Sequence, residues 1–155
     1  MSSLRLHYRS YTRLSLLLLS LCIACHSWAQ EGGFTLADWP NTQSTLKPIY
    51  VKAIMEQAGV HKVSFQKTAD FYVAELDKFA AFAQDKNYLP YLKTSVAQNL
   101  ATIAVIHCDW NNGVAPWEFA QTYLGDKQLE LLNPLYSDAI TKLKNNCGDN
   151  TTSTQ

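Results

Sequence analysis

The amino-acid sequence predicts an all-α protein: a single small bundle of four to five helices with one disulfide. Apolar residues recur at steps of three and four between residues 64 and 84, which is the spacing of one helix face. Prolines and glycines stand at the places where helices are expected to begin and end. Only two cysteines follow residue 29, so that part of the chain can form one internal bridge.

Residues 1–29 have the three parts of a secretory signal peptide. Three arginines and no acid lie in the first 13 residues, an almost unbroken apolar run follows at 14–24, and Ser27-Trp28-Ala29 has the form of a cleavage site. The apolar run is shorter than the ~20 residues that a membrane-spanning helix needs. We therefore expect a periplasmic or secreted protein whose mature chain begins near Gln30.

The mature chain is expected to hold one domain in three parts. Residues 30–46 are rich in Gly, Asn, Thr, Ser and Gln, which is typical of an extended N-terminal arm, with Phe34 and Trp39 as its anchors. Residues 47–147 are predicted to form the helical domain. The polar residues 148–155 are predicted to form a flexible tail.

The first helix is predicted over residues 48–58, because Pro48 suits a first helical position and Gly59 suits an exit. The second helix, over residues 64–84, has the clearest periodicity. Ser64 is expected to cap it by accepting a hydrogen bond from an early backbone N–H.

The third helix is predicted over residues 90–108. Its second half, LATIAVI, is apolar on nearly all sides, as in a helix surrounded by others. Its β-branched residues would also fit a strand, but the length and the proline at the start favour a helix. A fourth helix is predicted at 116–125, followed by a short turn at 126–132 and a last helix from Asn133-Pro134 to about residue 146.

The charge distribution argues against nucleic acid as the partner. All three arginines fall in the predicted leader, so the mature chain has ten lysines against thirteen acids. Recognition of phosphates and bases relies on arginine and on clustered positive charge. No run of like charges marks a membrane-binding patch either.

Cys108 and Cys147 are the two cysteines of the mature chain. In an oxidising compartment they most simply pair with each other, and two separate buried thiols are the alternative. Such a bridge would restrict the unfolded chain by roughly 4 kcal/mol in the loop-entropy treatment. It would fasten the end of the third helix to the end of the last one.

Motifs for cofactors and metals have little support. Cys22 to His26 has the C-x-x-C-H spacing of covalent haem attachment, but it would be removed with the leader. Cys25 also fits the lipidated first residue of a lipoprotein, which is the less favoured alternative to cleavage after Ala29. His107-Cys108-Asp109 places three ligand types together, but adjacent helix residues point in different directions. We expect no cofactor and no metal.

No catalytic residue is predicted. Ser64 and Lys67 match the S-x-x-K pattern of serine acyl-enzymes, but the companion S-D-N and K-T-G elements are absent, so a capping role for Ser64 is favoured. The acids are scattered, and no two of them form a recognisable catalytic pair.

The segment from Asp109 to Tyr123 is the strongest candidate for a functional surface. It mixes large aromatic residues with short polar ones, as protein interfaces do. The predicted partner-binding residues are Trp110, Asn111, Asn112, Trp117 and Glu118. The alternative is that Trp117 and Phe119 pack in the core and that Trp110 covers the disulfide.

The layout from Cys108 to Cys147 is a cysteine, a glycine-containing turn, a short helix, a second helix and a cysteine. About 40 residues carry it. Its anchors are Cys108, Val114, Tyr123-Leu124, Ala139 and Cys147. In this order of features the chain resembles the C-terminal half of small helical periplasmic immunity proteins, which bind and block cell-wall amidase effectors of type VI secretion. The resemblance implies a protein partner and assigns no inhibitory residue.

The leading hypothesis is therefore an exported, non-enzymatic protein that binds another protein in the periplasm. An inhibitor or immunity protein would insert the aromatic-and-acid loop into a cleft of its partner. The alternatives are an envelope assembly adaptor or chaperone such as a secretion pilotin, a small hydrolase with an unrecognised site, and a small-molecule carrier.

Overall fold

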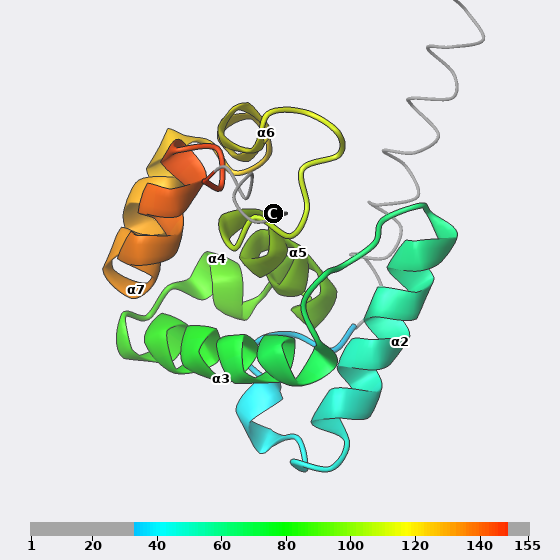
Figure 1. Cartoon of the computed structure of the whole chain (residues 1–155). Helices are drawn as coiled ribbons and strands as arrows, with labels where there is room; N and C mark the ends of the chain where they lie inside the picture. The colour runs from blue at the N-terminus through cyan, green and yellow to red at the C-terminus, as the bar shows by residue number, and fades with distance from the viewer. Residues whose placement is uncertain (1–32, 149–155) are drawn as a thin grey trace, which may run out of the picture. The chain divides into compact units, whose positions relative to one another are not determined.

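A computed structural model of the chain describes residues 33–148 (Figure 1). The all-α class is confirmed for these residues, which contain six α-helices and one 3₁₀ turn. The predicted signal peptide, the C-x-x-C-H motif, Cys25 and residues 149–155 lie outside the described residues.

The elements in chain order are the 3₁₀ turn η1 (Trp39–Asn41), α2 (Lys47–Val60), α3 (Ala69–Asp85), α4 (Leu89–Leu92), α5 (Val96–Ile106), α6 (Pro116–Tyr123) and α7 (Asp126–Lys144). Because α4 is a single turn, the bundle consists of five longer helices. The first and fourth predicted helices agree with α2 and α6 to within two residues at each end.

α5 forms the centre of the fold, as its all-round apolar character predicts. Eight of its 11 residues are buried, and Leu100, Ile103 and Ile106 are almost inaccessible to solvent. It packs against α3, α6 and α7, which lie around it in Figure 1. The loop that follows α5 therefore starts from the most enclosed element of the molecule.

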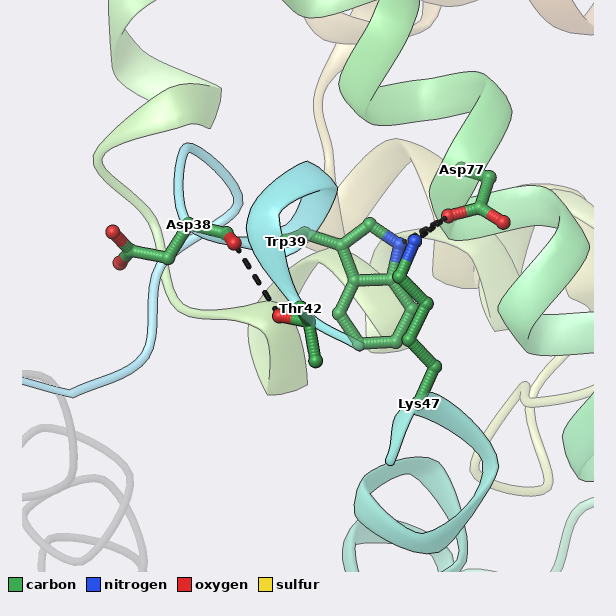
Figure 2. Close-up of polar contacts among 5 residues, drawn as sticks. All are labelled: Asp38, Trp39, Thr42, Lys47 and Asp77. Atoms are coloured by element: carbon green, nitrogen blue, oxygen red, sulfur yellow. Dashed lines mark hydrogen bonds and ion pairs between the residues drawn. The ribbon is translucent and has the colours of Figure 1, made fainter. Parts of the chain in front are cut away.

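Trp39 anchors the N-terminal arm to α3 (Figure 2). Its side chain is fully buried, and its Nε1–H donates to Asp77 Oδ1 at 2.8 Å. Lys47 places its Nζ 2.6 Å from the same oxygen and 5.1 Å from the centroid of the Trp39 ring. The Thr42 hydroxyl donates to the Asp38 carbonyl at 3.3 Å and closes the turn. Asp77 thus joins the arm, α2 and α3.

The prediction of one continuous third helix is wrong, because α4 and α5 are separate. Ser95 is the N-cap of α5, and its hydroxyl oxygen accepts a first-turn N–H at 3.2 Å. The N-terminal arm explains the break. The Leu36 N–H donates to the Thr94 carbonyl at 3.0 Å, and the Ala37 N–H donates to the Leu92 carbonyl at 3.1 Å. The arm therefore takes up carbonyls that a continuous helix would use.

The predicted cap at Ser64 is also wrong. α3 begins five residues later, because Thr68 has an extended backbone and its hydroxyl accepts the Phe71 N–H at 3.2 Å. Threonine with extended dihedrals is a favoured N-cap, so the apolar periodicity that starts at Phe65 extends beyond the helix itself.

α7 is one element from Asp126 onward, rather than a turn followed by a helix that begins at Asn133-Pro134. Gly125, at φ 78°, precedes it, and Pro134 lies inside it. The backbone leaves helical geometry at Tyr136, with φ −127° and ψ 31°. Because proline has no N–H and crowds the preceding turn, it bends this helix instead of starting it.

Replacing Trp39 with phenylalanine is expected to lower the free energy of unfolding by about 2 kcal/mol, because a hydrogen bond to a carboxylate is lost while a ring stays buried. Chemical denaturation measures the loss. In an Asp77→Ala background the same replacement should cost clearly less, and an equal cost in both backgrounds would contradict a role for the bond.

Candidate binding surface

The loop between α5 and α6 carries a buried carboxylate near its start, that of Asp109, which is 7% exposed. It accepts the backbone N–H of Gln66 at 2.7 Å and that of Lys67 at 3.0 Å. The Tyr72 hydroxyl donates a third hydrogen bond to it. Burial and the Asp109 carboxylate raise the pKa of Tyr72, so this hydroxyl keeps its proton. Several donors are what a buried carboxylate needs to offset its lost hydration.

Both ends of the loop are also fastened to the residues that follow α7. Cys108 and Cys147 form the predicted disulfide, with their Cα atoms 5.7 Å apart. Asn146 adds a second connection, because its Oδ1 accepts the backbone N–H of Trp117 at 3.3 Å. Residues 108–117 are therefore held at both ends.

Asn111 shapes the middle of this loop. Its Oδ1 accepts the Gly113 N–H at 3.1 Å, and its carbonyl accepts the Val114 N–H at 3.0 Å. Asn112 and Gly113 have φ values of 51° and 73°, a left-handed conformation that asparagine and glycine tolerate best. Asn111 therefore stabilises the turn, whereas the side chain of Asn112 is exposed.

Trp110, Phe119 and Tyr123 form an aromatic cluster beside the loop. The ring centroid of Trp110 lies 5.2 Å from that of Phe119 and 5.2 Å from that of Tyr123. The rings of Phe119 and Tyr123 stack at 5.7 Å. Tyr123 is 42% exposed, and the other two are half-buried. These contacts preform an aromatic face that solvent partly reaches.

The structure does not gather all predicted partner-binding residues into this cluster. Trp117 and Phe119 are two positions apart on α6, which separates them by about 200° around the helix. Trp117 lies under Lys144, whose Nζ is 5.7 Å from the ring centroid. Glu118 is exposed in the first turn of α6. The partner-binding role of these residues, and of Trp110, stays a prediction.

Phe119 and Tyr123 belong to the segment that the sequence singles out, but they are not among the predicted partner-binding residues. They are four positions apart within a predicted helix, and this spacing puts two side chains on the same face. Their contacts also show that Trp110 packs on α6.

A second group of titratable side chains lies between α3, α5 and α7. Glu75 is buried; its Oε1 accepts a hydrogen bond from Lys78 Nζ at 2.6 Å, and its Oε2 lies 3.3 Å from His107 Nε2. The second contact has the distance of an ion pair but not the direction of a hydrogen bond. The rings of Phe71 and Tyr136 meet that of His107 edge-on at 5.1 and 5.4 Å.

Burial lowers the pKa of His107, and this outweighs the opposing attraction of the Glu75 carboxylate. The imidazole is therefore neutral at pH 7. A neutral imidazole beside a carboxylate can accept a proton, but here aromatic rings enclose the pair, and the His107 side chain is only 20% exposed. Protonation of His107 is therefore expected to change the stability of the fold, because its pKa differs between the folded and the unfolded chain.

Within residues 33–148, no three or more His, Cys, Asp or Glu side chains gather as a metal site. No helix in this range has the length and hydropathy to cross a membrane. Ser64 and Lys67 lie before α3 instead of on a helical turn. A shallow open depression is lined by Tyr88, Lys127, Glu130, Leu131 and Pro134.

Comparisons with protein-family models, with curated protein sequences and with solved structures give no match.

Removing the Tyr72 hydroxyl with Tyr72→Phe is expected to lower the free energy of unfolding by about 2 kcal/mol, because Asp109 loses a buried donor. Asp109→Asn should cost at least as much, since its amide nitrogen cannot accept a hydrogen bond. The double variant should lose less than the sum, by about 1 kcal/mol or more. Tyr50→Phe, at an exposed tyrosine, is the control and should change little. Additive losses in denaturant titrations would contradict a shared contact.

Acidification from pH 7 to pH 5 is expected to destabilise the protein partly through His107. Its pKa is lowered in the folded state, so the unfolded chain, with a pKa of about 6.5, binds more protons in this range. The contribution of His107 to the free energy of unfolding is complete above a pH of about 6.5 and is lost as the pH falls below it. His107→Gln should flatten the dependence of unfolding free energy on pH, whereas His61→Gln, at an exposed histidine, should not. Identical slopes for both variants would refute the assignment.

Proposed function

We propose that this protein is an exported helical binding protein. It acts through the aromatic cluster and the segment 108–117, which comprises the loop and the first two residues of α6. The protein places this surface in a cleft of another protein. The most concrete form is a periplasmic inhibitor or immunity protein that occludes the active site of a cell-wall-degrading effector.

The observation that carries the proposal is a partly exposed aromatic cluster beside a loop that is fastened at both ends. Asp109 fixes one end through three hydrogen bonds, and the disulfide and Asn146 fix the connection to α7. A loop that is ordered before binding loses little conformational entropy when it binds. This arrangement favours a surface that recognises a partner over a loop that only connects two helices.

The chemistry of the surface supports the same proposal. Tryptophan and tyrosine contribute most often to the energetic centre of protein interfaces, and a polar rim around them is typical. Here Tyr123 and Val114 expose apolar surface, while Asn112 and Glu118 expose polar groups. Glu118 gives the rim an acid that a basic group of the partner can meet.

The disulfide and the leader support the proposed location. A bridge such as Cys108–Cys147 persists in oxidising compartments. A signal peptide at 1–29 would deliver the chain to such a compartment, and cleavage after Ala29 would leave a chain without a lipid anchor. The mass of the mature N-terminus tests this part separately.

The binding test uses the purified protein as bait for periplasmic proteins, with captured partners identified and their affinities measured. Trp110→Ala and Tyr123→Ala are each expected to weaken binding roughly thirtyfold, about 2 kcal/mol, if they lie at the interface centre. Glu118→Ala should reduce the association rate, most clearly at low salt. The wild type should inhibit the captured enzyme's hydrolysis of cell-wall material at concentrations at which Trp110→Ala and Tyr123→Ala have little effect.

Leu89→Ala is the matched control, because Leu89 is as exposed as Tyr123 but begins the single turn α4, outside the loop and α6. Thermal unfolding checks that each variant is folded. Unchanged affinity in all three surface variants would remove the loop and the cluster from the proposal. Capture of a secretion component without any effect on hydrolysis would support an envelope adaptor instead of an inhibitor.

A further inference from the structure

α2 presents an apolar stripe to solvent. Ile49 and Val60 are 64% and 73% exposed, and Leu46, directly before the helix, is 48% exposed. Ala53 lies between them on the same face, because steps of four and seven residues return to nearly the same side of a helix. Four of the seven exposed large apolar side chains in the described part of the chain fall within residues 46–60.

The opposite face of α2 already makes the contacts that the fold needs. Val51 is fully buried, and Ile54 and Met55 pack against the core. α2 lies against α3 on this side. A surface helix of a globular domain needs one apolar face, so the outer stripe has no role within the described domain.

Two opposite charges stand along one edge of this stripe. Lys52 and Glu56 are four positions apart and both exposed, and neither forms an ion pair within residues 33–148. If two copies of α2 pair antiparallel about a two-fold axis level with Ile54, the Lys52 side chain of each copy faces Glu56 of the other. A parallel arrangement does not produce this reciprocal match. The edge is therefore self-complementary in one orientation.

We propose that this stripe is a contact between two copies of the chain, in which two α2 helices pair antiparallel about the level of Ile54. Ile49 of each copy lies near Val60 of the other, Ala53 allows the helices to approach at the middle, and two reciprocal Lys52–Glu56 ion pairs fix the register. Each helix N-terminus also meets the C-terminal end of its partner, which their dipoles favour. A two-fold contact of this kind uses the same patch on both copies.

A second copy fits the stripe better than a lipid surface does. Helices that lie on membranes carry lysine and arginine along the polar side, whereas this edge alternates a lysine with a glutamate. One helix face against itself buries less than the ~1,200 Å² of a standard interface. The dimer is accordingly concentration-dependent. The proposal does not rest on the proposed function, whose surface lies on α6 and the preceding loop.

Charge variants test the register directly by sedimentation velocity over a wide concentration range. Lys52→Glu places two glutamates opposite two glutamates, and Glu56→Lys places two lysines opposite two lysines, so each variant should dimerise on the order of tenfold more weakly than the wild type. An equimolar mixture of the two variants should restore dimers, because the unlike charges then face each other. The double variant Lys52→Glu/Glu56→Lys should also dimerise like the wild type.

The mixture separates pairing between copies from effects inside one helix, since mixing cannot repair a contact within a single α2. Ile49→Asp should abolish the dimer, while Leu89→Asp, at an exposed leucine outside α2, should leave it intact. Monomers at every concentration would overturn the proposal. So would dimers that ignore the charge variants, or a mixture that fails to restore them. Binding of the monomer to phosphatidylcholine vesicles, lost in Ile49→Asp, would assign the stripe to a membrane and also overturn it.

Discussion

The buried carboxylate of Asp109 is the constraint on which the candidate binding surface depends. A charged group that is 7% exposed is stable only when several donors replace its hydration. Gln66, Lys67 and Tyr72 provide them from a segment far from the loop in sequence. Asp109 stands between Cys108 and Trp110 in the sequence. Its fixed position therefore also fixes where the disulfide and the aromatic cluster lie. The aromatic cluster of Trp110, Phe119 and Tyr123 thus lies beside a polar contact in which none of its three residues takes part.

Local patterns were enough to predict the class of the fold and its centre. The continuous apolar run of α5 requires neighbours on all sides, and the structure gives it three. With Cys108 and Cys147 as the only cysteines after residue 29, a single pairing was available in that part of the chain. The buried Trp39 could also be expected, because an apolar ring in a polar arm must find a partner surface. Each of these features depends either on residues that are close together in the sequence or on a residue type that occurs only once or twice in the segment concerned.

The helix boundaries and the site depend on distant residues, which the pattern does not contain. The arm takes carbonyls at Leu92 and Thr94, more than 50 positions later, and thereby divides one predicted helix into two. By residue type Ser64 is at least as good a cap as Thr68, yet α3 is capped by Thr68, whose backbone is extended. The separation of Trp117 from Phe119, in contrast, depends on local geometry alone. Two positions on a helix differ by about 200°, so the helical prediction already contained it.

α3 shows how one helix can carry two independent surfaces. Most of its inward side chains are apolar, but Asp77 binds the arm and α2, whereas Tyr72 binds Asp109 in the loop after α5. The α2 stripe and the α6 aromatic cluster therefore connect to the core through different residues of the same rigid element. A change in the Trp39–Asp77 contact acts first on α2, and a change in the Tyr72–Asp109 contact acts first on the loop. Distant sites without shared partners usually behave additively, so the proposed self-association and the proposed partner binding are expected to respond to different substitutions.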